Sequence, residues 1–223
     1  MSLALTEDEL PMDADAFTAQ LIDSIDERIE AEGLNSSRFD HDLSEEEMLD
    51  GLYTRVYNEL AVADAARRMT AQVDDPQIFV HLLKQLEDEA KHARMLSQRI
   101  HRLGGNPAEV FERADESARR FWGRFEGLDL IEGTAMLQAT TERIAHQRHQ
   151  HEADHYDEET AEIYRRVITP EEQFHSMIGV NILRTYCTDL EHQRVALRCA
   201  NESMAIRGDE LDSGVRNAYG NTE

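Results

Sequence analysis

The chain has 223 residues, and its 46 Asp and Glu residues against 23 Lys and Arg residues give a formal net charge of −23. Negative charge in this excess repels nucleic acid and anionic lipid, so we expect neither nucleic-acid binding nor membrane-surface binding. The hydrophobic fraction of 40% suits one folded domain, and no apolar run approaches the ~20 residues of a membrane span.

Apolar residues recur every three or four positions, which predicts helices nearly throughout the chain. The first helix is expected over residues 13–32, with Gly33 as its C-terminal stop. A capping box, Ser44-Glu45-Glu46-Glu47, begins a helix that should run to about Val73. Asp75 and Pro76 then begin a helix that should continue to Leu103.

A single short crossover helix is expected over residues 107–125, before the second half of the chain. The later helices are expected over residues 128–153, from Glu158 onward, and from the capping-box pattern at residues 188–191 to about Arg207. A polar, histidine-rich corner at residues 150–157 separates the first two of these. The tail from Asp209 is expected to fray.

Two Glu-x-x-His motifs, Glu89 to His92 and Glu172 to His175, each place a carboxylate and an imidazole on one face of a helix. A further glutamate stands thirty residues before each motif, at Glu59 and Glu142, so the two triplets are offset by a constant 83 residues. A third Glu-x-x-His pair, at residues 152–155, lacks such an upstream glutamate. The spacing therefore singles out two equivalent triplets.

Helix-pair geometry gives this spacing a meaning, because residues equidistant from a turn face each other in an antiparallel pair. The midpoint of the first triplet falls at residues 74–76, where a turn is predicted independently, and the midpoint of the second falls at residues 157–158. The stretch of helix between the turn and the triplet residues is then about 22 Å long on each side, which places these side chains well inside the helix pair. Glu172 reaches Glu142 only if Pro170 is an interior kink or bulge rather than a helix start.

Several carboxylates buried together need protons or cations, and two divalent metal ions would satisfy them. The pattern resembles the ferritin-like di-iron or di-manganese carboxylate superfamily, in which two helices give a Glu and two give Glu-x-x-His. The resemblance covers residues 44–190. It implies an all-α, ferritin-like four-helix bundle with a crossover helix, preceded by an arm and helix over 1–43 and followed by a helix and tail over 191–223.

By position, the resemblance implies metal ligands at Glu59, Glu89, His92, Glu142, Glu172 and His175. It also implies that Glu89 and Glu172 bridge two iron ions, with manganese as the alternative. His146, Asp88 and Glu171 are candidates for supporting contacts to these ligands, and His146 could also be an extra ligand, although a partly buried polar histidine is the simpler interpretation. His149, His151 and His155 are expected in a solvated corner. Alanines before Glu142 and Gly179 after His175 could open a cavity or let helices pack closely.

The resemblance implies an oxidoreductase that activates O2, an oxidase or oxygenase acting on a small-molecule substrate with an external electron donor. Alternatives are ferroxidase activity with iron storage, peroxide removal as in rubrerythrin or manganese catalase, and a metal-free helical interaction module. The helices outside the bundle favour the oxidase, because they could cover a substrate pocket or build a homodimer contact. With two cysteines, no CxxC pair and an acidic N-terminal segment, we expect a cytoplasmic protein.

Overall fold

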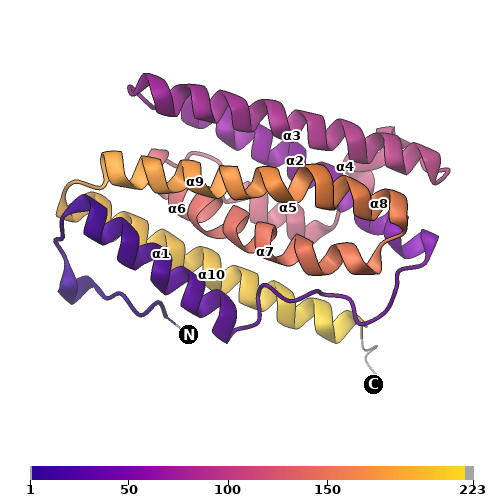
Figure 1. Cartoon of the computed structure of the whole chain (residues 1–223), viewed down its shortest axis with the longest axis horizontal. Coiled ribbons are helices and arrows are strands. Elements are labelled where there is room, and N and C mark those ends of the chain that lie inside the picture. Colours follow the sequence, from indigo (N-terminus) through magenta and orange to yellow (C-terminus); the bar gives the residue numbers. More distant parts are fainter. Residues whose placement is uncertain (1, 219–223) are drawn as a thin grey trace. The chain divides into compact units, whose positions relative to one another are not determined.

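The computed structural model describes residues 2–218, and its side chains through residue 207, as an all-helical chain without strands (Figure 1). The all-α prediction is confirmed, whereas the four-helix arrangement stays a prediction. The α-helices are α1 (Ala14–Ala31), α2 (Glu45–Thr70), α3 (Pro76–Arg102), α4 (Val110–Arg113), α5 (Glu116–Gly123), α6 (Leu130–Met136), α7 (Arg143–Glu152), α8 (Glu158–Ile163), α9 (Thr169–Tyr186) and α10 (Leu190–Ala218). Among the described residues, no helix combines the length and apolarity that a bilayer span requires.

Five shorter segments complete the helical course. Those at η1 (Glu7–Glu9), η2 (Pro107–Glu109) and η4 (Ala153–His155) are 3₁₀ turns. Those at η3 (Leu137–Glu142) and η5 (Tyr164–Ile168) are π-helical. Because π segments insert an extra residue into a turn, they shift the face that the following residues present.

The predicted helix starts are confirmed at α2 and α3. At α2, the Ser44 hydroxyl accepts from the Glu47 amide at 3.3 Å, and the Glu47 carboxylate accepts from the Ser44 amide at 2.9 Å. Hydrogen bonds from Ser44 lower the pKa of Glu47 to about 2. At α3, the Asp75 carboxylate accepts from the amides of Gln77 and Ile78, at 2.8 and 2.9 Å, and Pro76 occupies the first turn.

Three boundaries differ from the predictions. The crossover is not one helix, because Ala114 is extended (φ −57°, ψ 142°) and Asp115 caps α5 as a separate element. Asp189, rather than Thr188, caps α10, since its carboxylate accepts from the His192 amide at 3.0 Å. The backbone of α10 also continues to Ala218 instead of fraying from Asp209, while residues 219–223 lie outside the described part.

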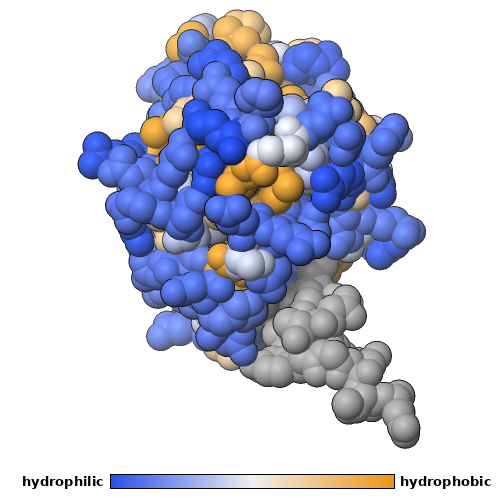
Figure 2. All heavy atoms as spheres, turned by 90° about the vertical axis from the view of Figure 1, so that its right-hand side faces the viewer, coloured by the Kyte–Doolittle hydropathy of each residue, from blue (hydrophilic) through white to orange (hydrophobic). Residues whose placement is uncertain are grey.

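The chain forms two compact units by its contacts. Unit 1 comprises Met1–Arg38, Ile131–Glu152 and Glu172–Glu223, and unit 2 comprises Phe39–Leu130 and Ala153–Glu171. Each unit therefore contains segments from both halves of the sequence. Figure 2 shows one face of the molecule, on which hydrophilic side chains prevail and hydrophobic ones form small patches, as the composition implies.

Unit 2 is built on the pair formed by α2 and α3, which lie side by side (Figure 1). Its core contains Met48, Leu52, Tyr53, Val56, Ala93, Leu96, Ile100, Val110, Ala153, Ile163, Tyr164 and Ile168. The buried Tyr53 hydroxyl accepts from the Asn106 amide at 3.0 Å. A Cβ atom at Gly105 would stand 2.8 Å from that hydroxyl, so only glycine lets the chain after α3 approach so closely.

Unit 1 joins both ends of the described chain to its middle. Asp26 of α1 pairs bidentately with Arg143 of α7, each N···O distance being 2.5 Å. The Ser203 hydroxyl of α10 donates to the Met136 carbonyl at 3.1 Å. The buried Gln193 amide donates to the carbonyls of Met12 and Cys187. These contacts hold α1 and α10 against the segment that contains η3.

Pro170 lies inside a helical run, as the spacing of Glu142 and Glu172 required. Helical structure is continuous from Glu158 to Tyr186, and η5 directly precedes α9, in which Pro170 is the second residue. Proline lacks an amide hydrogen and its ring clashes with the preceding turn of an α-helix. The π-helical turn at residues 164–168 directly precedes the turn that contains Pro170, and Glu172 stands within the continuous helical run rather than at its start.

Asp157, at the turn before α8, is expected to make the free energy of unfolding decrease as the pH falls into the acid range. Burial raises the pKa of Asp157, but hydrogen bonds from Thr160 and the Arg99 guanidinium outweigh it and lower the pKa below 3.8. A lowered pKa stabilises the fold above the unfolded-state value and loses that contribution as pH falls through the folded-state value. Asp157→Asn keeps the cap on the Thr160 amide but removes the charge, so urea unfolding between pH 5 and pH 2 should show a shallower pH slope than for the wild type. An unchanged slope would contradict this assignment.

Candidate metal centre

Unit 2 brings together the first sequence triplet. Glu59 comes from α2, Glu89 and His92 come from α3, and their exposed fractions are 5%, 1% and 0%. Each offers one ligand atom, and these atoms lie within 4.8 Å of one another. The prediction that residues equidistant from the 74–76 turn face each other is thereby confirmed for this helix pair.

The His92 ring divides its two nitrogens between different carboxylates. Its Nδ1 atom lies 3.1 Å from Glu59 Oε2 and 3.5 Å from Glu89 Oε2. Its Nε2 atom lies 2.7 Å from Glu171 Oε2. With Nε2–H donated to Glu171, the Nδ1 lone pair is directed at the two predicted ligand carboxylates, and this is the tautomer that a metal at the triad requires.

Glu171 is itself held by a lysine. Its second carboxylate oxygen accepts from Lys91 Nζ at 2.5 Å, and Lys91 also donates to the buried Asp88 at 3.0 Å. Lys84, which stands one turn before Asp88 on α3, donates to the same Asp88 oxygen as Lys91 does. Burial lowers the pKa of Lys91, whereas its bonds to Glu171 and Asp88 raise it, and the net shift is upward. Lys91 therefore stays charged and neutralises part of the acidic cluster.

Glu171 thus makes the contact to His92, a predicted ligand, that the sequence suggested, while Asp88 accepts from both lysines. Lys84 and Lys91 were not among the predicted site residues. The signal in the sequence was their rarity, because they are the only lysines among 23 Lys and Arg residues. Lys84 shortly precedes the first Glu-x-x-His motif, and Lys91 lies within it.

Unit 1 brings together the second triplet. Glu142 is the last residue of η3, and Glu172 and His175 lie on α9, with exposed fractions of 3%, 3% and 0%. One ligand atom from each lies within 4.8 Å of the others, and His175 Nδ1 is 3.1 Å from Glu172 Oε2. The structure therefore assembles each triplet within its own unit, and the meeting of the two in one centre stays a prediction.

Close packing explains the small residues beside the second triplet. A Cβ atom at Gly179 would lie 2.7 Å from the Gln138 Cβ and 3.0 Å from the Ala139 amide nitrogen. Ala135 and Ala139 are fully buried. Of the two functions considered for these residues, close approach of α9 to η3 is the one that the structure supports.

The additional histidines behave differently from one another. His146 is partly buried and contacts Gln150 at 3.3 Å, and no ligand group among the described residues includes it. His151 is exposed as expected, but His149 is only 2% exposed, so its assignment to a solvated corner is wrong. Its helix is covered by the segment after α1, where the Leu34 carbonyl accepts from Arg148 at 3.0 Å.

The donor chemistry of each triplet fits a divalent transition metal. Two carboxylates and one imidazole suit iron or manganese better than a thiolate-preferring metal. Bonds of about 2.1 Å hold ligand atoms at most ~4.2 Å apart, so small side-chain shifts would close each triplet on an ion. No protein-family model matches the chain, and no curated protein compared with it is significantly similar.

Proposed function

We propose that the protein is a di-metal oxidoreductase that binds two iron ions, with manganese as the alternative metal. The observation that carries the proposal is the repetition, in two units, of a buried triplet of two glutamates and one histidine. The ferritin-like resemblance of the sequence supports the joining of the two triplets in one dinuclear centre. On this proposal the chain is an oxidase or oxygenase that uses O2, a small-molecule substrate and an external electron donor.

The residues of unit 2 would hold one of the two metal ions and fix the tautomer of its histidine ligand. When bound, the metals would supply the redox chemistry with O2. Glu59, Glu89 and the Nδ1 atom of His92 would hold one ion, and Glu171 would keep the proton on His92 Nε2. The charge of Lys91 holds Glu171 in that position. Burial of the triplet excludes bulk water from the ligands.

Unit 1 would supply the corresponding groups from its own helices. Glu142 and Glu172 would give the carboxylates and His175 the imidazole of the second ion. The π-helical course of η3 sets the direction of Glu142 at its last residue. The close contact of Gly179 with Gln138 fixes α9 beside that segment.

Metal analysis with O2 consumption tests the proposal. Protein loaded anaerobically with Fe(II) and desalted should retain about two irons per chain and consume O2 when a reductant is present. Glu89→Ala and Glu172→Ala should each lose iron, and the exposed Glu87→Ala on α3 is the matched control. Wild-type protein that retains no iron would refute the metal centre. Iron storage would give a different result. The protein would form a large shell, would consume O2 in proportion to the Fe(II) added, and would deposit an iron mineral.

A further inference from the structure

The first turns of α3 expose a group of apolar side chains. Phe79 is 40% exposed, Val80 is 59% exposed and Leu83 is 41% exposed, and Pro76 beside them is exposed as well. Three or four residues separate each of them from the next along the helix, so they share one face of α3. These four residues are called the α3 patch below. Four other large apolar side chains are exposed among the described residues, and none of those four lies on α3.

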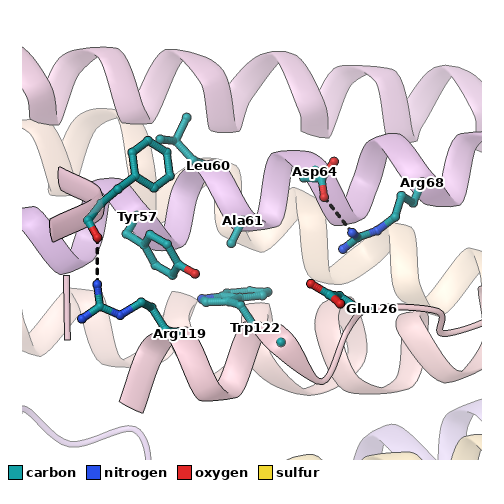
Figure 3. A pocket seen from close by; sticks show the side chains of 10 residues that line it. Tyr57, Leu60, Ala61, Asp64, Arg68, Arg119, Trp122 and Glu126 are labelled. Carbon is teal, nitrogen blue, oxygen red and sulfur yellow. Dashed lines mark hydrogen bonds and ion pairs between the residues drawn. The ribbon is translucent and has the colours of Figure 1, made fainter. Parts of the chain in front are cut away.

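The other exposed apolar side chains of unit 2 belong to a pocket. Leu60 and Phe111 line this pocket of about 360 Å³, which opens between α2 and the segment from α4 to residue 126 (Figure 3). Figure 3 shows Tyr57 and Leu60 on α2 above the Trp122 ring of α5. No residue of the α3 patch lines the pocket, so the patch is a separate feature of the surface of unit 2.

The α3 patch lies in a stretch of the chain without carboxylates. Residues 76–86 contain no Asp or Glu, although 46 of the 223 residues are acidic. The stretch includes the first turn of α3, where an acidic side chain would stabilise the helix through its dipole. Its one formal charge is that of the half-exposed Lys84. A second chain with a net charge of −23 therefore meets little like-charge repulsion at this surface.

The positions of the four apolar residues make the α3 patch complementary to itself. In an antiparallel pair of identical helices related by a two-fold axis, residues equidistant from the axis face each other. With the axis between Phe79 and Val80, each of these side chains faces the other one on the second copy. Pro76 and Leu83 are also equidistant from this axis. Every apolar side chain of the patch therefore packs against an apolar side chain.

The charges that border the α3 patch are complementary in the same register. Asp75 and Lys84 stand equally far from the axis, so each Lys84 faces Asp75 of the second copy. Asp74, which adjoins Asp75, is exposed and adds negative charge at that end. Opposite charges thus meet at both ends of the contact, whereas a parallel arrangement would place Lys84 against Lys84.

We propose that the α3 patch is the interface of a homodimer in which the α3 helices of two copies pack antiparallel. A second copy is the occupant because the same residues supply both its apolar and its charged complements. The contact covers residues 75–84 of each copy, about 15 Å of helix. It is therefore a small interface, below about 1,200 Å² in total, and its dissociation constant should be on the order of 10 µM. The patch contains none of the triplet residues, so the dimer does not depend on the proposed metal chemistry.

Sedimentation equilibrium of the full chain as purified tests this proposal. The wild type should show a monomer–dimer equilibrium between about 1 and about 200 µM chain. Val80→Glu places a carboxylate in the apolar contact and should raise the dissociation constant at least tenfold. Phe111→Glu is the matched control, because it adds the same charge at an exposed apolar residue of unit 2 outside the patch, and it should leave the constant within twofold. A wild type that stays monomeric, or a Val80→Glu variant that dimerises like the wild type, would overturn the proposal.

A second pair of variants tests the antiparallel register. Lys84→Glu should weaken dimerisation several-fold, because the new carboxylate faces Asp75 of the second copy. Adding Asp75→Asn should recover most of that loss, since asparagine still caps α3 and removes the repulsion. A double variant that dimerises no better than Lys84→Glu alone would overturn the register and the proposal with it. Both variants change half-exposed or capping residues conservatively enough to fold, and circular dichroism should show unchanged helix content.

Discussion

Replacing Glu89 by Gln is expected to stabilise the metal-free protein and to abolish its stabilisation by Fe(II). Glu89 is 1% exposed, and one of its carboxylate oxygens lies within 4.8 Å of a possible ligand atom from each of Glu59 and His92. A buried carboxylate costs desolvation energy that a neutral amide of the same shape largely avoids, so the metal-free variant should gain about 1–3 kcal/mol. Wild-type protein should gain about 4 kcal/mol when free Fe(II) exceeds its Kd a thousandfold.

Urea unfolding under anaerobic conditions, with Fe(II) or with a chelator, measures both effects. Glu172→Gln should behave in the same way in unit 1, where Glu172 belongs to the second triplet. Glu87→Gln removes an exposed carboxylate from α3 and should change neither quantity by more than about 0.5 kcal/mol. If Glu89→Gln destabilised the metal-free protein and kept the full Fe(II) effect, Glu89 would be a structural partner of His92 rather than a ligand.

Arg38→Met is expected to cost about 3 kcal/mol of unfolding free energy, because it removes a partner of a fully buried carboxylate. Arg38 Nε lies 2.7 Å from Glu152 Oε1, and the side chain of Glu152 is 0% exposed while that of Arg38 is 40% exposed. The loss therefore reflects a carboxylate left without this counter-charge in the interior of unit 1.

A double-mutant cycle separates this charge effect from lost packing. Adding Glu152→Gln to Arg38→Met should recover most of the lost stability in urea unfolding at pH 7, since the buried group is then neutral. Arg120→Met offers a comparison, because its pair with Glu116 is exposed and should contribute less than about 1 kcal/mol. A double variant as unstable as Arg38→Met alone would show that the arginine acts through its contacts and not through its charge.

Local sequence signals predicted most helix boundaries because the groups that decide them are neighbours in the chain. Ser44 with Glu47, and Asp75 with Pro76, satisfy free amides within one turn, and the structure confirms both starts. The thirty-residue spacing also succeeded, since an antiparallel pair with a known turn leaves little freedom in which residues face each other. The first triplet could therefore be predicted from arithmetic alone.

Features that depend on packing could not be predicted in this way. The break at Ala114 interrupts a run with helical periodicity, and its extended conformation depends on contacts such as that of the Asp115 amide with Thr54. The burial of His149 depends on a segment more than a hundred residues earlier in the chain. A π-helical turn leaves the hydrophobic periodicity almost unchanged, so η3 could not be predicted from the pattern of apolar residues.

The scarcity of lysine has a practical consequence. Both primary amines on side chains stand on α3 and contact Asp88, with Lys84 48% exposed and Lys91 28% exposed. Amine-directed reagents will therefore modify this chain almost entirely at Lys84, Lys91 and the N-terminus. Covalent labelling, immobilisation or cross-linking through amines would perturb the ion pairs behind His92, whereas attachment through engineered surface thiols would leave them intact.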